Sequence, residues 1–142
     1  MNFVLDASLA LAFVLKDEAT AATDRVLDSF SQGAKACAPA LLRWEVANVL
    51  LMAERRKRIT QAEAHRHLTL LKALPIEIDE GAMDEAWSAT LLLARKHKLT
   101  SYDAGYLELS IRRGVALGSL DDELRAAAKV EKVLLLPERV RG

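Results

Sequence analysis

Acidic side chains beside apolar residues are the most informative feature of this chain. They occur in four short strings, namely Phe3-Val4-Leu5-Asp6-Ala7-Ser8, Trp44-Glu45-Val46-Ala47-Asn48, Leu99-Thr100-Ser101-Tyr102-Asp103-Ala104 and Ser119-Leu120-Asp121-Asp122. An ionised carboxylate that is buried without a partner costs several kcal/mol. A hard divalent cation such as Mg²⁺ or Mn²⁺ takes oxygen ligands and compensates two carboxylates at once. The strings therefore predict a metal site built from carboxylates.

Most of these acids also have a purely structural interpretation. Asp6 follows an apolar run and could act only as the N-cap of the next helix. Asp103 and Asp122 each lie three residues after a threonine or a serine, which is the spacing of a capping box. Asp121 is the member of the adjacent pair that such a box does not use. It is therefore the better ligand candidate of the two.

Glu45 is the hardest of the acids to explain structurally. At helical spacing it falls in line with Leu42 and Val49, at the buried edge of an apolar arc. A structural glutamate in that place would need an arginine or lysine partner. Arg43 lies off that face, so the local sequence offers no such partner. Glu45 is therefore a candidate functional acid.

Other chemistries find less support in the sequence. His65 and His67 are two residues apart on a predicted helix and cannot face one ligand, and His97 stands among basic residues. Ser8 has no histidine placed to form a nucleophilic triad, and the scattered glycines form no phosphate loop. Cys37 is the only cysteine, which excludes an internal disulfide and a thiolate metal site.

The order of apolar segments predicts an α/β fold in which one parallel sheet positions the acids. Strands are expected over residues 2–5, 35–38, 76–78, 115–117 and 133–136, and helices over 9–14, 17–31, 41–57, 60–74, 81–97, 100–112 and from 121 onward. Strands separated by helices imply right-handed crossovers, and ligands of such folds bind beyond the carboxyl ends of the strands. Asp6, Asp103 and Asp121 can all converge on that edge.

Length and composition indicate one soluble globular domain over residues 1–142. The chain is 51% hydrophobic and 28% charged. We expect a cytoplasmic protein without membrane contact, because no apolar run approaches the roughly 20 residues of a membrane span and no basic leader follows Met1. The net charge is zero, so charge alone does not indicate nucleic-acid binding. The basic run Arg55-Arg56-Lys57-Arg58 either contacts phosphates or complements a helix dipole.

The high apolar content also predicts self-association. The short helices around Leu9 to Val14 and Leu68 to Leu74 carry more apolar surface than one face of a small sheet can cover. We therefore expect a symmetric homodimer. Trp44 and Trp87 are expected to make core or subunit contacts rather than to stack on bases.

The four strings, the third extended to Leu109 and the fourth to Ala127, resemble the sequence blocks of PIN-domain ribonucleases, especially VapC-type toxins of toxin–antitoxin pairs. The resemblance covers nearly the whole chain and implies a three-layer α/β/α PIN-like domain with a central parallel sheet. It also implies Mg²⁺- or Mn²⁺-dependent endonucleolytic cleavage of structured RNA, such as tRNA or rRNA, and inhibition by a cognate antitoxin. The catalytic and metal-binding acids of the family fall on Asp6, Glu45, Asp103 and Asp121, with Thr100 as a polar helper. Whether Asp122 shares or replaces the role of Asp121 stays open.

Two other functions compete with a nuclease. The first is a phosphoacceptor signalling domain with Asp79 as the acceptor, although the chain lacks an adjacent acidic pair after its first strand and a lysine after a later one. The second is a catalytically silent PIN-like scaffold that acts only through protein contacts. Metal-assisted hydrolysis by the four acids, with water as the nucleophile, remains the main prediction.

Overall fold

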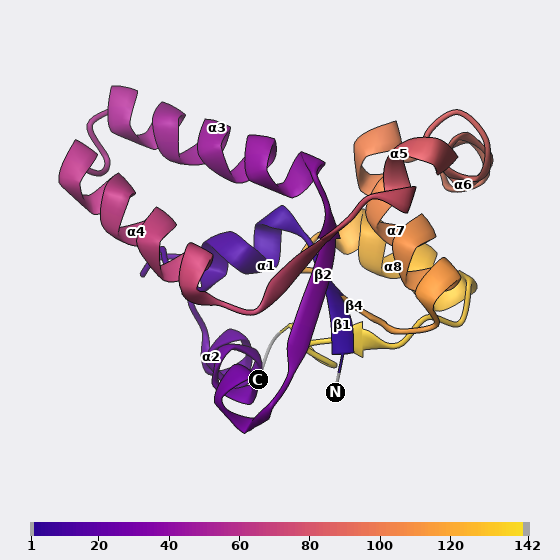
Figure 1. The fold of residues 1–142 in the computed structure, drawn as a ribbon, viewed down its shortest axis with the longest axis horizontal. Helices are drawn as coiled ribbons and strands as arrows, with labels where there is room; N and C mark the ends of the chain where they lie inside the picture. The colour runs from indigo at the N-terminus through magenta and orange to yellow at the C-terminus, as the bar shows by residue number, and fades with distance from the viewer. Residues whose placement is uncertain (1, 141–142) are drawn as a thin grey trace.

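A central sheet of five parallel strands organises the protein. The computed structural model describes residues 2–140. The strands are β1 (Asn2–Leu5), β2 (Lys35–Pro39), β3 (Ile76–Asp79), β4 (Ala116–Gly118) and β5 (Leu135–Leu136), in the spatial order β3-β2-β1-β4-β5 (Figure 1). Val4 of β1 pairs with Cys37 on one side and Leu117 on the other. β1 is thus the central strand, which explains why Phe3, Val4 and Leu5 are completely buried.

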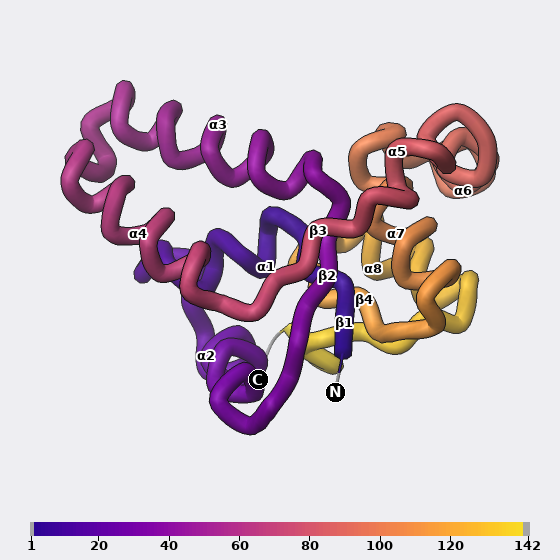
Figure 2. Tube along the Cα trace, in the orientation of Figure 1, coloured from indigo at the N-terminus to yellow at the C-terminus, as the bar shows by residue number. Residues whose placement is uncertain are grey.

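Helices cover both faces of this sheet. They are α1 (Ala7–Ala12), α2 (Ala21–Ser29), α3 (Leu41–Arg55), α4 (Gln61–Ala73), α5 (Gly81–Glu85), α6 (Ala89–His97), α7 (Ser101–Arg113) and α8 (Asp122–Val130), with a 3₁₀ turn over Phe30–Gln32. Figure 1 shows α1 to α4 on one side of the sheet and α5 to α8 on the other. In Figure 2, α3 and α4 run side by side as a helical pair that extends away from the sheet. The predicted three-layer α/β/α fold with a central parallel sheet is confirmed.

Several helix ends differ from the predicted ones by a few residues, since α1 ends at Ala12, α2 at Ser29 and α3 at Arg55, and two helices differ more. The helix expected from residue 17 begins at Ala21, because Thr20 and Thr23 form a reciprocal capping box. The helix expected over residues 81–97 is two helices, because Ser88 adopts a φ of −125° and a ψ of −97°, which a helix does not allow. The expected strands 115–117 and 133–136 are confirmed as strands, but they lie at Ala116–Gly118 and Leu135–Leu136.

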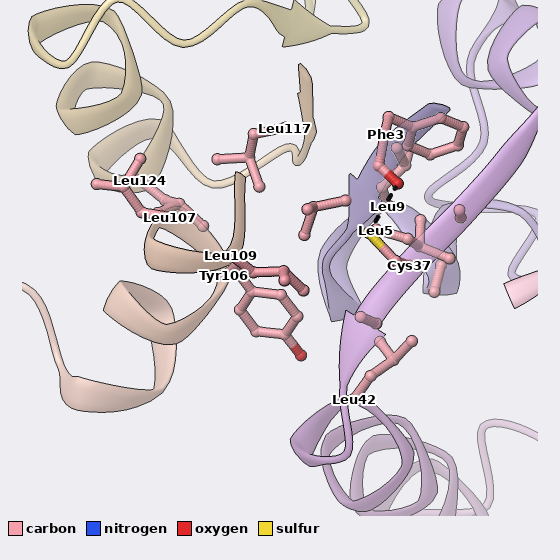
Figure 3. Close-up of a cluster of buried hydrophobic side chains, with 14 of the residues drawn as sticks. Phe3, Leu5, Leu9, Cys37, Leu42, Tyr106, Leu107, Leu109, Leu117 and Leu124 are labelled. Carbon is pink, nitrogen blue, oxygen red and sulfur yellow. Dashed lines mark hydrogen bonds between the residues drawn. The ribbon is translucent and has the colours of Figure 1, made fainter. Parts of the chain in front are cut away.

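The hydrophobic core lies between the sheet and the two helical layers. Figure 3 shows its largest members, which include Phe3, Leu5, Leu9, Leu107, Leu117 and Leu124. Gly118 lets α1 approach β4, since a Cβ there would lie 2.7 Å from Leu9 Cδ2 and 3.1 Å from the carbonyl oxygen of Val4. This close packing brings the end of β4 next to the start of α1. Among the described helices, none is long and apolar enough to cross a membrane.

Candidate active site

Asp6 and Asp121 both lie just beyond the carboxyl ends of neighbouring strands. Asp6 follows β1 and is the N-cap of α1, where its Oδ1 accepts a hydrogen bond from the amide of Leu9 at 3.0 Å. Asp121 follows β4 and is the N-cap of α8, where its Oδ1 accepts from the amide of Leu124 at 2.8 Å. The amide of Asp6 also donates to the carbonyl of Gly118 at 3.0 Å. The ends of β1 and β4 therefore hold the two acids at one edge of the sheet, as the sequence predicts.

Two serine hydroxyls hold the carboxylate of Asp6. Ser8 donates to Oδ1 at 2.7 Å, and Ser119, which is completely buried, donates to Oδ2 at 2.5 Å. Burial nevertheless raises the pKa of Asp6 from 3.8 to about 6, because desolvation outweighs these hydrogen bonds and the charge of Asp103 adds to it. Asp6 is therefore a carboxylate whose negative charge lacks full compensation in the protein alone.

The same two serines connect the loop after β1 with the loop after β4. The Ser119 hydroxyl accepts from the amide of Asp121 at 3.0 Å, and the Ser8 hydroxyl accepts from the amide of Leu120 at 2.8 Å. The sequence alone suggests Ser8 only as a nucleophile and Ser119 only as the start of a capping box. Their position beside Asp6 and Asp121 within the acidic strings is the signal that could have identified them as supporting groups.

Asp103 stands in the first turn of α7, close enough to the other acids to interact with them electrostatically. Thr100 is the N-cap of this helix, and its hydroxyl accepts from the amide of Asp103 at 3.1 Å. The pKa of Asp103 is raised by partial burial and then by the negative charges of Asp121, Glu45 and Glu123, in that order. The structure thus brings Asp103 near Asp121 and Glu45, and near Asp6 as well.

Glu45 reaches this cluster from the second turn of α3. Its partner is a tyrosine rather than a basic residue, because the hydroxyl of Tyr106 on α7 donates to Oε1 at 2.5 Å. The predicted apolar arc of α3 is also too wide, since Val49 is 40% exposed. The role of Tyr106 was not predicted, because it lies 61 residues from Glu45 along the chain. Its only local signal is a position one helical turn after Asp103.

The prediction that Asp122 caps α8 is wrong. Asp121 is the N-cap and Asp122 is an exposed residue of the first turn. The physical reason is that the hydroxyl of Ser119 points inward to Asp6 and so cannot cap the helix that follows. Asp121 therefore combines the two roles that the sequence divides between neighbours. Its Oδ1 caps α8 and Oδ2 remains for other contacts.

None of the four acids takes part in an ion pair within residues 2–140. The acids are neighbours, but as they stand no three His, Cys, Asp or Glu side chains of this described range converge on one metal position. They therefore form a group of carboxylates without ion-pair partners rather than a closed coordination site.

Asp79 belongs to a separate network of ion pairs at the end of β3. Arg112 Nη2 lies 2.7 Å from its Oδ2, and Arg113 Nη2 lies 2.8 Å from its Oδ1. Hydrogen bonds from Arg112 lower the pKa of Asp79 to about 2, and Arg113 contributes further. Two guanidinium groups thus occupy both oxygens, which excludes the phosphoacceptor alternative.

Other features of the sequence fall outside the acidic group. A cavity of about 530 Å³ lies between α1, α3, α4 and β3, and none of the four acids lines it. Trp44 and Trp87 are 77% and 91% exposed, so the prediction of core contacts is wrong for both and a subunit contact stays a prediction. His97 contacts Glu131, with 2.7 Å between Nε2 and Oε2, in a partly buried pair apart from the acidic group.

Comparison with known families decides the classification of this fold. The PIN domain model matches residues 3–130. The chain belongs to the PIN-domain family. This PIN domain is 32% identical over 128 residues to Ribonuclease VapC3 from Pyrobaculum aerophilum, a match that covers 87% of this chain and 92% of the relative.

Two solved structures share the fold of this PIN domain. The crystal structure of PAE2754 from Pyrobaculum aerophilum superposes with a TM-score of 0.71 at 21% identity, over 99% of this chain and 93% of that one. VapBC2 from Rickettsia felis, bound to a DNA fragment from its promoter, gives a TM-score of 0.68 at 10% identity, over 95% of this chain and 97% of that one. Both likenesses extend through all three layers.

Proposed function

We propose that this PIN domain is an endoribonuclease that hydrolyses phosphodiester bonds with the help of Mg²⁺ or Mn²⁺. The observation that carries the proposal is the group formed by Asp6, Glu45, Asp103 and Asp121, whose charges no basic side chain of residues 2–140 pairs. The 32% identity to a protein named as a ribonuclease supports it. Catalysis by these four acids is part of the proposal.

The donor set fits a hard divalent cation. All four side chains offer carboxylate oxygens, which Mg²⁺ and Mn²⁺ prefer over nitrogen and sulfur ligands. Burial, and to a lesser extent mutual repulsion, raises the pKa values of Asp6 and Asp103, and a nearby cation relieves both effects. Asp6, Asp103 and Asp121 would hold the ion, with Glu45 completing the site.

When bound, such a cation lowers the pKa of a water molecule and polarises the scissile phosphate. The side chains of the protein orient the acids. Ser8 and Ser119 fix the orientation of Asp6, and the cap of α8 fixes Asp121. Because both serine hydroxyls already donate to a carboxylate, neither is free to attack phosphorus. Water is then the nucleophile in an in-line displacement, and no covalent intermediate on a side chain forms.

The cellular role we propose is that of the toxin in a type II toxin–antitoxin pair, with tRNA or rRNA as the substrate. The name VapC3 of the 32% identical relative supports a toxin of this type. A cognate antitoxin protein is the proposed partner, in line with the fold shared with VapBC2. We propose that the protein acts in the cytoplasm, where these RNAs are found. We also propose that it forms a homodimer, which light scattering at micromolar concentration would detect.

An RNA cleavage assay tests the proposed function. Purified protein is incubated with total tRNA and rRNA in Mn²⁺ or in EDTA, alongside the variants Asp6→Asn and Asp28→Asn. Asp28 is an exposed acid of α2 and serves as the matched control. We expect cleavage by the wild type and by Asp28→Asn in Mn²⁺ alone, and none by Asp6→Asn. Equal cleavage with the chelator would reject the metal mechanism, and no cleavage under any condition would favour a silent scaffold.

A further inference from the structure

Tyr106 connects two helices that carry candidate metal ligands. Its side chain is 1% exposed, and its hydroxyl donates to Glu45 Oε1 at 2.5 Å. Figure 3 shows the ring within the core cluster and the hydroxyl pointing out of that cluster, toward the start of α3 near Leu42. A buried hydroxyl therefore lies at the border between the apolar core and the acidic group.

The position of Tyr106 on α7 relates it to a second acid. Asp103 precedes it by three residues, so the two side chains lie on the same face of the helix, one turn apart. Tyr106 thus shares a face of α7 with one candidate ligand, while its hydroxyl donates to another.

The contact between Tyr106 and Glu45 is not part of the main helix packing. α3 packs chiefly against α1, α4 and β2, whereas α7 packs chiefly against α5, α6, α8 and the central strands. The hydrogen bond thus ties Glu45 to the helix of Asp103 across a junction where the two helices share little other packing. It also occupies Oε1 alone, so that Oε2 of Glu45 remains available.

We infer that Tyr106 is a positioning residue that holds Glu45 at the right distance from Asp103 for both to serve one divalent cation. This inference rests on the proposed function, because it assumes that the acidic group binds a metal. One helix, α7, then supplies a ligand directly through Asp103 and orients another through the hydroxyl of Tyr106. Residues that orient metal ligands in this way typically change metal affinity about 10- to 100-fold when they are altered.

Mn²⁺ titration of the full chain by calorimetry tests this role. Tyr106→Phe keeps the ring that fills the core and removes only the hydroxyl. We expect it to weaken Mn²⁺ binding by roughly 10-fold. Tyr102→Phe, which alters a 60% exposed tyrosine of the same helix, is the matched control and should bind as the wild type does.

A double variant separates positioning from a general loss of structure. In the background of Glu45→Gln, removing the Tyr106 hydroxyl should cause no further loss of Mn²⁺ affinity, because the carboxylate it orients is already absent. An equal loss in both backgrounds would overturn the inference, and so would unchanged binding by Tyr106→Phe. Glu45→Asp gives a check that leaves Tyr106 intact, since the shorter side chain draws the carboxylate away from the hydroxyl. It should also lose roughly 10-fold in affinity, and wild-type affinity would contradict the inference.

The titration also distinguishes the two proposals from each other. If the wild type binds no Mn²⁺, the proposed function fails and the role of Tyr106 fails with it. If the wild type and Tyr106→Phe bind Mn²⁺ equally while Asp6→Asn does not bind it, the metal site stands and only the positioning role is overturned.

Discussion

The hydroxyl of Ser119 donates to Oδ2 of Asp6 across 113 residues of sequence, and the hydroxyl oxygen of Ser119 accepts a hydrogen bond from the amide of Asp121. This single buried group therefore fixes two candidate ligands relative to each other. The bond to Asp6 joins the loop after β4 to the loop after β1, and the bond from the Asp121 amide lies within the loop after β4. The geometry of the acidic group therefore depends on a residue that carries no charge.

Ser119→Ala should destabilise the metal-free protein and disturb the site together. We expect a loss of about 1.5–3 kcal/mol at pH 7, the usual range for a hydrogen bond to a charged group. The loss should be smaller at pH 4, where Asp6 is largely protonated. Urea unfolding in EDTA measures both values. Ser31→Ala, the control, removes an exposed hydroxyl bonded to the carbonyl of Asp28 and should change stability little. An equal loss of stability in both variants would contradict the role of the Ser119 hydroxyl in holding Asp6.

The raised pKa of Asp6 predicts a specific pH dependence of stability. Because its pKa is 3.8 before folding and about 6 after it, Asp6 favours the folded state while protonated, and that contribution disappears as the pH rises between these values. In EDTA at pH 7, Asp6→Asn should therefore be more stable than the wild type by roughly 2–3 kcal/mol. At pH 3.5 the two should be nearly equal. Urea unfolding across this range checks the prediction, which a constant difference would contradict.

Sequence patterns predicted those parts of the site that depend on local order along the chain. Asp6 and Asp121 could be placed because both follow strands whose carboxyl ends must share an edge of a parallel sheet. The contacts of Ser119 and Tyr106 could not be predicted, since each joins segments whose distance is set only by packing. The division of the predicted helix 81–97 into α5 and α6 could not be predicted for a similar reason, because nothing in the residue types around Ser88 reveals the non-helical backbone that separates them.

The ion pairs around Asp79 should contribute to stability independently of the acidic group. Arg112→Leu leaves Asp79 with Arg113 alone and frees the carboxylate of Glu108, so we expect a loss of about 1–3 kcal/mol at pH 7. Since the pKa of Asp79 is lowered to about 2, its contribution is present above pH 3.8 and is lost as the pH falls toward 2. Urea unfolding measures the loss, and Mn²⁺ affinity should remain that of the wild type. A matching loss of metal affinity would show that the two networks are linked.

Changing Asp121 or Asp122 to asparagine should have different effects on stability and on RNA cleavage. Asparagine is as good an N-cap as aspartate, so Asp121→Asn should keep the cap of α8. In EDTA its free energy of unfolding should lie within about 0.5 kcal/mol of that of the wild type. It should nevertheless lose RNA cleavage in Mn²⁺, because the carboxylate next to Asp103 is gone. Asp122→Asn removes an exposed charge in the first turn of α8. It should cost about 0.3–0.5 kcal/mol through the helix dipole and retain most of the cleavage rate. Thermal melting and RNA cleavage of both variants show which of the two residues is the fourth candidate ligand. An inactive Asp122→Asn together with an active Asp121→Asn would assign that role to Asp122 instead of Asp121.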